Sequence, residues 1–164
     1  MYFWGHRPSS TGIDKSCLSQ WFPSAFEHSD LQFPTAEHFM MYRKAELFGD
    51  ADIASKILQA DSPGEAKALG RQVRAFDEAA WREFRWSIAV DGNYAKFSQN
   101  EALREFLVAT GNRVLVEASP VDTIWGIGLD YKAATHLHPS EWRGENILGF
   151  VLMEVRGMLL DGSM

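Results

Sequence analysis

Apolar residues recur at helical spacing through most of the chain, and this pattern predicts a mainly helical fold. Residues that favour helix ends stand beside several of the periodic segments. Thr35 is a good N-cap for the first of them, which is expected to stop near Gly49. Ser62, Pro63 and Glu65 have the spacing of a capping box. The expected helices cover residues 35–48, 50–60, 62–74, 77–97, 100–111 and 146–159.

The pattern outside these helices predicts a small β component and several loops. RVLVEAS alternates and is rich in β-branched residues, so a strand is expected over 114–118, and YFW near the start is a second, shorter one. The rest of residues 1–33 is expected to be irregular, as are SPVDTIWGIGLD and YKAATHLHPSEWRG. Gly92 and Asn93 are a point at which the long fourth helix can break. We therefore expect one domain, residues 1–164, of the α+β class with helix dominant.

The first expected helix, PTAEHFMMYRKAELF, carries two charges in its apolar stripe. One face, at about 100° per residue, is shared by four residues: Glu37, Met41, Lys44 and Phe48. Each charge alone has a structural explanation, because a carboxylate in the first turn complements the helix dipole and a lysine can bury its stem. Together they place an acid and an amine about 10 Å apart along the axis. Both side chains could therefore converge on a bound ligand.

The charge balance and the cysteine content narrow the classes of function. The net charge is −6 and the sequence pI is about 5.3, which argues against a nonspecific nucleic-acid binder because such proteins need a positive surface. The single cysteine, Cys17, excludes an intrachain disulfide and a thiolate zinc site, which suits a reducing compartment. The sequence lacks the apolar run of a signal peptide and has no stretch near the ~20 apolar residues of a membrane span. A soluble, cytoplasmic protein is expected.

The segment SPVDTIWGIG is a second candidate for a binding site. Asp122 and Trp125 flank a predicted turn. Gly126 and Gly128 allow the backbone to approach a ligand closely. Glu117 comes at the end of the predicted strand, a usual place for catalytic chemistry. The alternative is a plain turn with a tryptophan in the core.

Two further segments have both a binding and a structural interpretation. In WRGENILG, Gly144 and Asn146 precede a helix N-terminus, which can hold a phosphate through free N–H groups, and plain capping by Asn146 is equally consistent. In GNYAKFSQN, Lys96 follows a Gly-Asn pair, and a solvated lysine is the simpler interpretation. HLHP lacks the partner ligands of a metal site. WGIGLD lacks the third glycine and the following helix of a dinucleotide fingerprint.

Five segments in a fixed order resemble the NADAR, or YbiA-like, family. They are TAEHFMMYRKAELF, LGRQVRAFDEAAW, AKFSQNEALREFLVATG, LVEASPVDTIWGIGL and WRGENILGFVLMEVR. The resemblance runs from about Phe3 to Leu160 and rests on the ordered set, because no single motif is decisive. It implies an N-glycosidase fold that is mostly helical with a small sheet. It also implies that no metal or redox cofactor takes part.

The resemblance further implies roles for the candidate residues. Glu37, Lys44 and Asp122 are the expected catalytic residues. The residues expected to bind substrate are Glu117, Trp125, Gly126, Gly128, Asn146, Lys96, Arg71 and Trp21. The lysine either attacks C1′ as a neutral amine to form a Schiff base or stays cationic and binds a phosphate or hydroxyl group. The sequence leaves these two roles open.

The resemblance implies two classes of substrate. Family members split the C–N bond between a ribose phosphate and a pyrimidine amine in early riboflavin intermediates, and others remove ADP-ribose from guanine bases. The expected partner is therefore a small phosphorylated nucleoside-like molecule or an ADP-ribose adduct, with nucleic acid only as a modified substrate and no membrane partner. The acidic charge favours free small molecules. A module that binds NAD-type nucleotides without turnover is the non-enzymatic alternative, and the sequence does not predict the oligomeric state.

Overall fold

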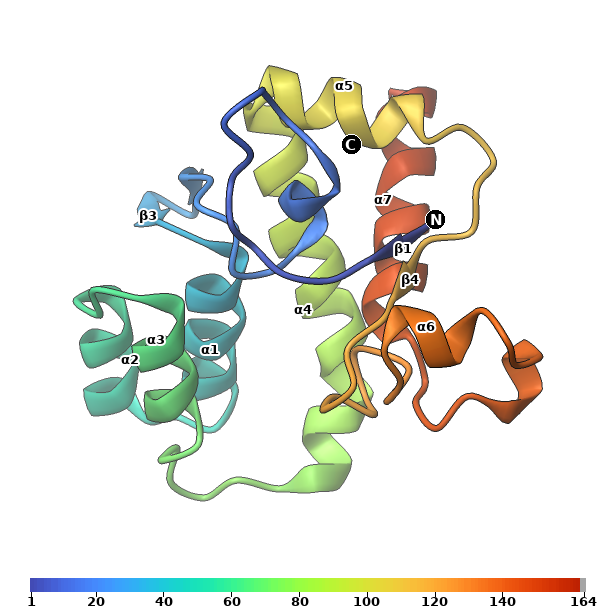
Figure 1. Cartoon of the computed structure of the whole chain (residues 1–164). Coiled ribbons are helices and arrows are strands. Elements are labelled where there is room, and N and C mark those ends of the chain that lie inside the picture. Colours follow the sequence, from blue (N-terminus) through green and yellow to red (C-terminus); the bar gives the residue numbers. More distant parts are fainter. Residues whose placement is uncertain (163–164) are drawn as a thin grey trace. The chain divides into compact units, whose positions relative to one another are not determined.

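The computed structural model describes residues 1–162, and within them the chain divides into two compact units. One unit is continuous and covers residues 20–100. The other combines residues 1–19 with the chain from residue 101 onward. Figure 1 shows the chain and labels most of its helices and strands. The mainly helical α+β class predicted from the sequence is confirmed.

Four helices form most of the continuous unit, and each begins at a predicted cap. They are α1 (Ala36–Leu47), α2 (Ala51–Leu58), α3 (Pro63–Gly70) and α4 (Glu78–Gln99). The side chains of four residues accept a hydrogen bond from the backbone N–H three residues on: Thr35, Asp50, Ser62 and Asp77. The capping box before α3 is modified, because the Glu65 carboxylate accepts from Asp61 N–H at 2.9 Å, one residue before the cap.

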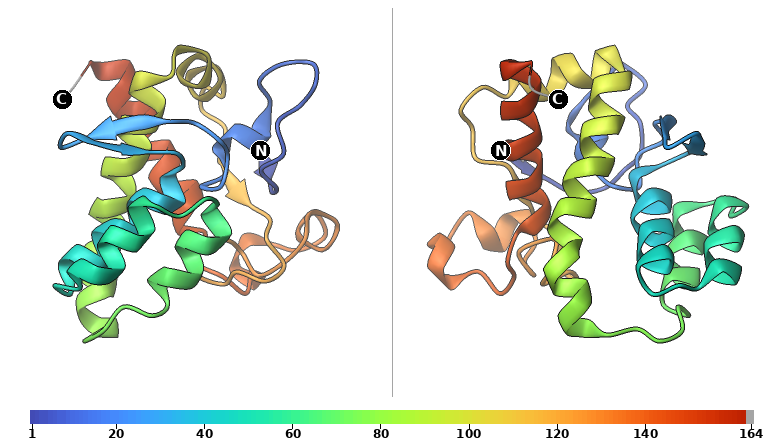
Figure 2. Two further views of the ribbon diagram at one scale, coloured as in Figure 1. Left: turned by 90° about the vertical axis from the view of Figure 1, so that its left-hand side faces the viewer. Right: turned by 180° about the vertical axis from the view of Figure 1, so that it is seen from behind.

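Helix α1 is the centre of this unit and packs against α2, α3 and α4. Two views of the chain show α1, α2 and α3 lying side by side (Figures 1 and 2). Gly70 permits the contact with α3, since a Cβ there would lie 2.1 Å from Met41 Sδ. Gly92 permits the contact with α4, since a Cβ there would lie 2.4 Å from a ring carbon of Phe39. The expected break of α4 at Gly92 is therefore wrong, because this glycine sits at a close crossing inside an unbroken helix.

A short hairpin occupies part of the segment that the sequence pattern marked as irregular. Strand β2 (Phe26–His28) pairs antiparallel with β3 (Leu31–Phe33). The two turn residues, Ser29 and Asp30, both have positive φ, at 50° and 62°, as a two-residue type I′ turn requires. Phe26 and Phe33 pack against the ring of Phe39, with ring centroids 5.9 and 5.2 Å away, so the hairpin covers the buried side of α1.

The second unit contains a short parallel strand pair, three helices and two 3₁₀ turns. Strand β1 (Tyr2–Phe3) pairs with β4 (Val116–Glu117), which is shorter than the predicted strand over 114–118. The helices are α5 (Glu101–Ala109), α6 (Tyr131–Ala134) and α7 (Ile147–Asp161), with 3₁₀ turns at Lys15–Leu18 (η1) and Pro139–Glu141 (η2). Helix α6 and η2 lie in a segment expected to be irregular. Helix α7 packs against α5 and β4.

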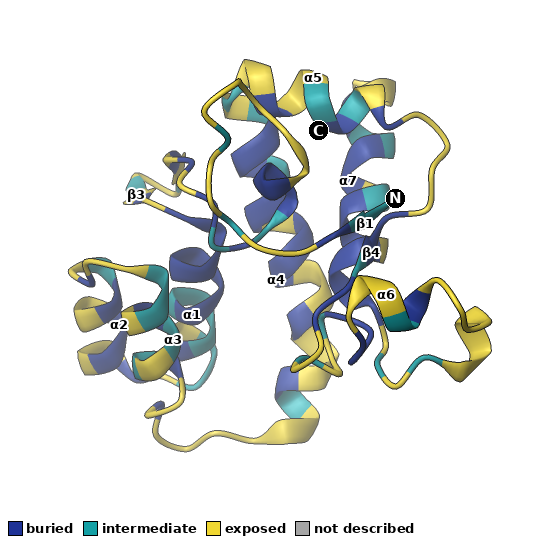
Figure 3. Cartoon of the chain, viewed as in Figure 1, coloured by how far each residue is buried: buried dark blue, intermediate teal, exposed yellow. Residues whose placement is uncertain are grey.

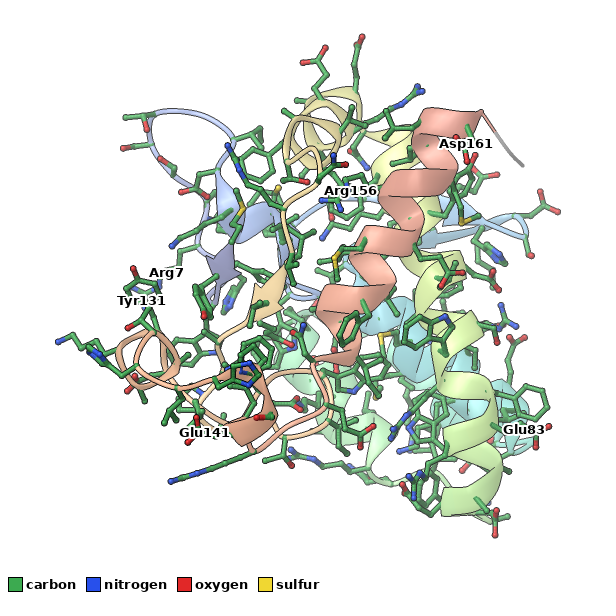
Figure 4. All side chains as sticks on the ribbon, turned by 90° about the vertical axis from the view of Figure 1, so that its right-hand side faces the viewer. Arg7, Glu83, Tyr131, Glu141, Arg156 and Asp161 are labelled. Carbon is green, nitrogen blue, oxygen red and sulfur yellow. The ribbon has the colours of Figure 1, made fainter. Side chains whose placement is uncertain are left out.

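Arg156 joins α7 to the chain that follows α5. Its guanidinium donates to the Thr110 hydroxyl at 2.7 Å and to the Arg113 carbonyl at 3.0 Å. Figure 4 shows Arg156 on α7, with Tyr131 and Glu141 on the segment between β4 and α7. Figure 3 shows how burial is distributed over the helices: the outer faces of α2 and α3 are exposed, whereas α1 and α7 are largely buried. Among residues 1–162, none of the helices is long and apolar enough to cross a membrane.

Candidate functional site

Glu37 is a buried carboxylate in the first turn of α1. Only 6% of the residue is exposed, although glutamate is rarely buried to this extent without a compensating environment. Its backbone N–H donates to the Gln20 carbonyl at 3.0 Å, which fixes the start of the helix against the preceding loop. The free N–H groups of a helix N-terminus favour a negative charge at this position. The structure thus places Glu37 in the apolar stripe, as the helical wheel predicts.

Lys44 lies two turns further along α1 and is half-buried between aromatic rings. Its Nζ is 4.3 Å from the centroid of Phe76 and 5.7 Å from that of Trp81. Burial lowers the pKa of Lys44 below its ordinary value, because a charged ammonium loses hydration there. The charge of Glu78 opposes this shift. The charge of Arg71 lowers the pKa of Lys44 further, and the charge of Glu37 raises it by the smallest of these effects.

The surroundings of Lys44 include residues that the sequence pattern did not single out. Phe76 and Glu78 lie in and just after the loop between α3 and α4, and Trp81 is in the first turns of α4. All three belong to the segment LGRQVRAFDEAAW, which carries part of the family resemblance. The family resemblance of this segment could have pointed to these residues, but nothing in their spacing along the sequence shows that their side chains face Lys44.

Arg71 and Trp21 are placed at opposite ends of α3. Arg71 is the exposed C-cap residue of that helix. The indole of Trp21 is half-buried against its first turn, since a Cβ on Gly64 would lie 3.6 Å from the ring. Lys67 Nζ lies 5.9 Å from the Trp21 ring centroid. Substrate binding by Arg71 and Trp21 stays a prediction.

Lys96 is fully buried on α4, with 0% of the residue exposed. Its Nζ lies 4.9 Å from the Phe97 ring centroid and 5.9 Å from that of Phe22. The interpretation of Lys96 as a solvated lysine is therefore wrong, because the residue lies on the buried face of α4. A role in binding phosphate stays a prediction.

Two surface cavities in the same unit lie along a different face of α1. Each has a volume of about 420 Å³, and both are lined by Arg43 and Glu46. One is completed by side chains of α4 and the other by the β2–β3 hairpin. Neither of these two cavities is lined by Glu37 or Lys44. The buried charges of α1 therefore lie apart from the linings of these two cavities.

In the other unit, Asp122 shapes the turn that precedes Trp125. One carboxylate oxygen accepts hydrogen bonds from the backbone N–H groups of Ile124, at 2.9 Å, and Trp125, at 2.8 Å. Asp122 N–H itself donates to the Ser119 hydroxyl at 3.2 Å. The predicted turn is confirmed, and Trp125 is half-buried beside it. The catalytic role of Asp122 stays a prediction.

Gly126 and Gly128 make room for the chain itself. A Cβ on Gly126 would lie 2.9 Å from the Glu117 carbonyl oxygen. Gly128 has a φ of +66°, and a Cβ there would lie 3.0 Å from Arg143 Cβ. At both glycines the close neighbours are therefore other segments of the protein. Contact of either glycine with substrate stays a prediction.

Asn146 ties β4 to the start of α7. Its amide oxygen accepts from Glu117 N–H at 2.9 Å, and its amide nitrogen donates to the Leu115 carbonyl at 3.0 Å. The residue has a left-handed backbone conformation and does not cap the helix with its side chain, so the capping interpretation is wrong. The half-buried Glu117 is held next to this bridge. Substrate binding by Asn146 and Glu117 stays a prediction.

The N-terminus of α7 does not present the free phosphate-binding donors that its sequence suggested. The N–H groups of Asn146, Ile147 and Leu148 donate to carbonyls of residues 124–126, at 3.1 to 3.2 Å. A phosphate would have to displace these bonds, so the expected phosphate site is wrong for these three donors. The sequence could not show this, because the accepting carbonyls come from a segment 20 residues earlier.

The predicted site residues are divided between the two units. The continuous unit carries Trp21, Glu37, Lys44, Arg71 and Lys96. The other unit carries Glu117, Asp122, Trp125, Gly126, Gly128 and Asn146. Across residues 1–162, no group of three or more His, Cys, Asp or Glu side chains is arranged to hold a metal ion. Within the continuous unit, two of the other predicted residues, Arg71 and Glu37, affect the pKa of Lys44, in opposite directions.

Known proteins of similar sequence cover most of the chain. An N-glycosidase of Acanthamoeba polyphaga mimivirus is 40% identical over 161 residues, which is 95% of this chain and 94% of that protein. N-glycosidase YbiA of Escherichia coli is 32% identical over 127 residues, 77% of this chain and 71% of that protein. A riboflavin biosynthesis protein of Vibrio vulnificus is 31% identical over 88% of this chain but only 35% of its own length.

The fold is also similar to a solved structure. The NMR structure of the Escherichia coli protein YbiA matches with a TM-score of 0.76 and 27% identity, covering 99% of this chain and 85% of that one. The sequence model of the NADAR domain matches residues 2–160, so it spans segments of both units. The chain belongs to the NADAR domain family.

Proposed function

We propose that this chain is an N-glycosidase that hydrolyses the C–N bond of a phosphorylated N-riboside, namely the ribosylaminopyrimidine phosphates of riboflavin biosynthesis. The observation that carries the proposal is the Lys44 amine, whose pKa is lowered by burial and whose helix also bears the buried carboxylate of Glu37. The names of the mimiviral relative and of YbiA, both N-glycosidases, support the reaction class. The Vibrio relative supports the substrate class, since it is named a riboflavin biosynthesis protein.

The proposed reaction uses Lys44 as a nucleophile. The lone pair of its neutral amine attacks C1′, the C–N bond breaks, and the leaving nitrogen takes a proton and departs as the free aminopyrimidine. The sugar ring then opens to give a Schiff base between Nζ and C1′. Water adds to this carbon and releases ribose 5-phosphate, which regenerates the amine. A lowered pKa raises the fraction of neutral amine at physiological pH.

Glu37 is proposed to stabilise positive charge at the reacting carbon. Breaking a ribosyl C–N bond develops positive charge on C1′ and O4′ and negative charge on the leaving nitrogen. A buried carboxylate interacts strongly with such charge because few water molecules screen it. The same carboxylate disfavours deprotonation of Lys44, but its influence on the pKa of that lysine is smaller than those of burial, Glu78 and Arg71. Asp122 is the proposed further catalytic residue.

A turnover assay with trapping tests the proposal. Purified protein is incubated with ribosylaminopyrimidine phosphates, and ribose 5-phosphate is followed by mass spectrometry. Borohydride added during turnover should reduce the Schiff base and leave a ribose phosphate adduct on Lys44. Lys44→Ala should abolish both signals, whereas Lys56→Ala, on the exposed face of α2, should keep them. Near-normal turnover by Lys44→Ala would refute the mechanism.

The same assay separates the proposed substrate from the other class that the family resemblance implies. ADP-ribosylated guanosine is offered in parallel, because its ribosyl C–N bond calls for the same chemistry at the sugar. Release of ADP-ribose from this compound alone would replace the proposed substrate class while leaving the roles of Lys44 and Glu37 in place. Stabilisation of the protein by ADP-ribose, with no product from either compound, would identify a binding module instead.

A further inference from the structure

The loop between α3 and α4, residues 71–77, is fastened to the start of α2. Arg74 donates from its backbone N–H and from Nε to one Asp50 oxygen, at 2.9 and 3.1 Å, and from Nη2 to the other, at 2.7 Å. The same Nη2 reaches Asp52 at 2.9 Å. The Asp50 carboxylate is buried and also accepts the N–H of Ile53 as a helix cap. A bidentate contact between a guanidinium and a carboxylate fixes the orientation of both groups, so it holds the loop in one position against α2.

The residue that follows Arg74 has an uncommon backbone conformation. Ala75 has a φ of +56°, in the left-handed region that residues with a Cβ seldom adopt. Such a conformation is strained and persists only where the surrounding contacts impose it. Here the contacts of Arg74 on one side and the capped start of α4 at Asp77 on the other fix the two ends. The strained turn directs the next side chain, that of Phe76.

Phe76 is an exposed aromatic residue with two ordered partners. It is 41% exposed, yet its ring makes an edge contact with Phe48 at the end of α1, with centroids 5.3 Å apart. The other partner is the Lys44 amine, 4.3 Å from the ring centroid. The ring centroid of Trp81 is 5.7 Å from the same amine. The ring of Phe76 therefore covers an amine that would otherwise face water.

We propose that Phe76 is a positioning residue for Lys44, held by the Ala75 turn so that its ring covers the reactive amine and sets how readily that amine is protonated. This inference rests on the proposed function, in which Lys44 acts as a neutral amine. The ring has two opposing effects. Its π face attracts the ammonium form, whereas its exclusion of water favours the neutral form.

The other groups that face Lys44 set the background for these effects. Glu78, in the first turn of α4, and Glu37, on α1, favour the ammonium form. Arg71, at the end of α3, favours the neutral form. None of these charges is altered by a substitution at Phe76, so a change in the titration of Lys44 in such a variant reports on the ring.

Two substitutions separate the effects of the ring. Phe76→Leu keeps an apolar cover but removes the π face, so the pKa of Lys44 should fall by about half a unit, given the strength of a half-exposed cation–π contact. Phe76→Ala loses the π face as well but also admits water to the amine, and it should raise the pKa because burial is the largest influence on the pKa of Lys44. At neutral pH the leucine variant should therefore contain about threefold more neutral amine than wild type.

The titration is measured on the free protein, without substrate. Limited acetylation with acetic anhydride is followed across pH by mass spectrometry of the peptide that carries Lys44, with exposed Lys56 as the internal reference. The expected result is a lower midpoint for Phe76→Leu and a higher one for Phe76→Ala. An unchanged midpoint in both folded variants would overturn the inference, and so would a shift of both in one direction.

The pH dependence of turnover then shows whether the ring matters to the reaction. The acid limb of the rate profile should move with the titration midpoint in each variant, which a merely structural role for Phe76 would not cause. An acid limb that stays in place while the midpoint moves would refute the positioning role. If Lys44 titrates as expected but wild type turns over no substrate, the proposed function fails while the contact between ring and amine stands.

Discussion

Asn146 offers a direct test of how the unit around β4 is held together. The residue is 1% exposed, and its amide makes one hydrogen bond to each side of Val116 along β4, at the Leu115 carbonyl and the Glu117 N–H. Asn146→Ala removes both partners at once. Each backbone group left without a partner in a buried setting costs about 1–3 kcal/mol. The left-handed φ of 55° adds roughly 1–2 kcal/mol for alanine, because asparagine tolerates this region better.

The free energy of unfolding should therefore fall by at least about 3 kcal/mol in Asn146→Ala, a large part of the ~5–15 kcal/mol typical of a domain. Asn146→Gly is the matched control, since it loses the same two bonds without the backbone strain and should be more stable than the alanine variant by about 1 kcal/mol. Urea unfolding followed by circular dichroism gives both free energies, provided that the dependence of the unfolding free energy on urea concentration is the same for the variants and for wild type. A glycine variant within about 0.5 kcal/mol of wild type would refute the bridging role.

Three other substitutions test features of the continuous unit. Gly70→Ala should lower the melting temperature, because the new Cβ would overlap the Met41 side chain, whereas Gly157→Ala on α7 has open space and should not. Hydrogen bonds hold the pKa of Asp50 far below its ordinary value, so its stabilising effect is present above about pH 4 and is lost as pH falls, and Asp50→Asn should flatten acid unfolding below about pH 5. Ala75→Gly should raise stability by up to about 1 kcal/mol in denaturant unfolding, because glycine adopts positive φ without strain, and equal or lower stability would contradict strain at that turn.

The helices were predictable because their signals are local. Thr35, Ser62 and Asp77 each stand where a side-chain oxygen can accept from an N–H three residues on, and that geometry needs no other part of the chain. The β2–β3 hairpin was not predicted, because its local sequence signals are weak. Its strands have three residues each, too few for alternation to be recognised, and its turn is Ser29-Asp30 instead of the Asn-Gly pair that marks such turns.

The candidate site was predictable only where it follows a helix period. Glu37 and Lys44 could be placed on one face because α1 is regular, and the structure keeps both in its stripe. Phe76 could not be placed, since its position depends on the φ of Ala75 and on a contact between Arg74 and a distant helix cap. Tertiary contacts of this kind leave no periodic trace in the sequence.

The two units differ in when they can form during synthesis. Every strand and helix of the continuous unit lies between residues 20 and 100, so this part has all its own partners once that stretch has left the ribosome. Tyr2 and Phe3, by contrast, are made long before Val116 and Glu117, so β1 has no strand to pair with until that later segment has been made. Long-range pairing of this sort is slow, because the entropy of closing a large loop is lost before the stabilising contacts between the strands form. Strand β1 therefore stays for a long time as an unpaired edge of the nascent chain, exposed to wrong partners or to a chaperone.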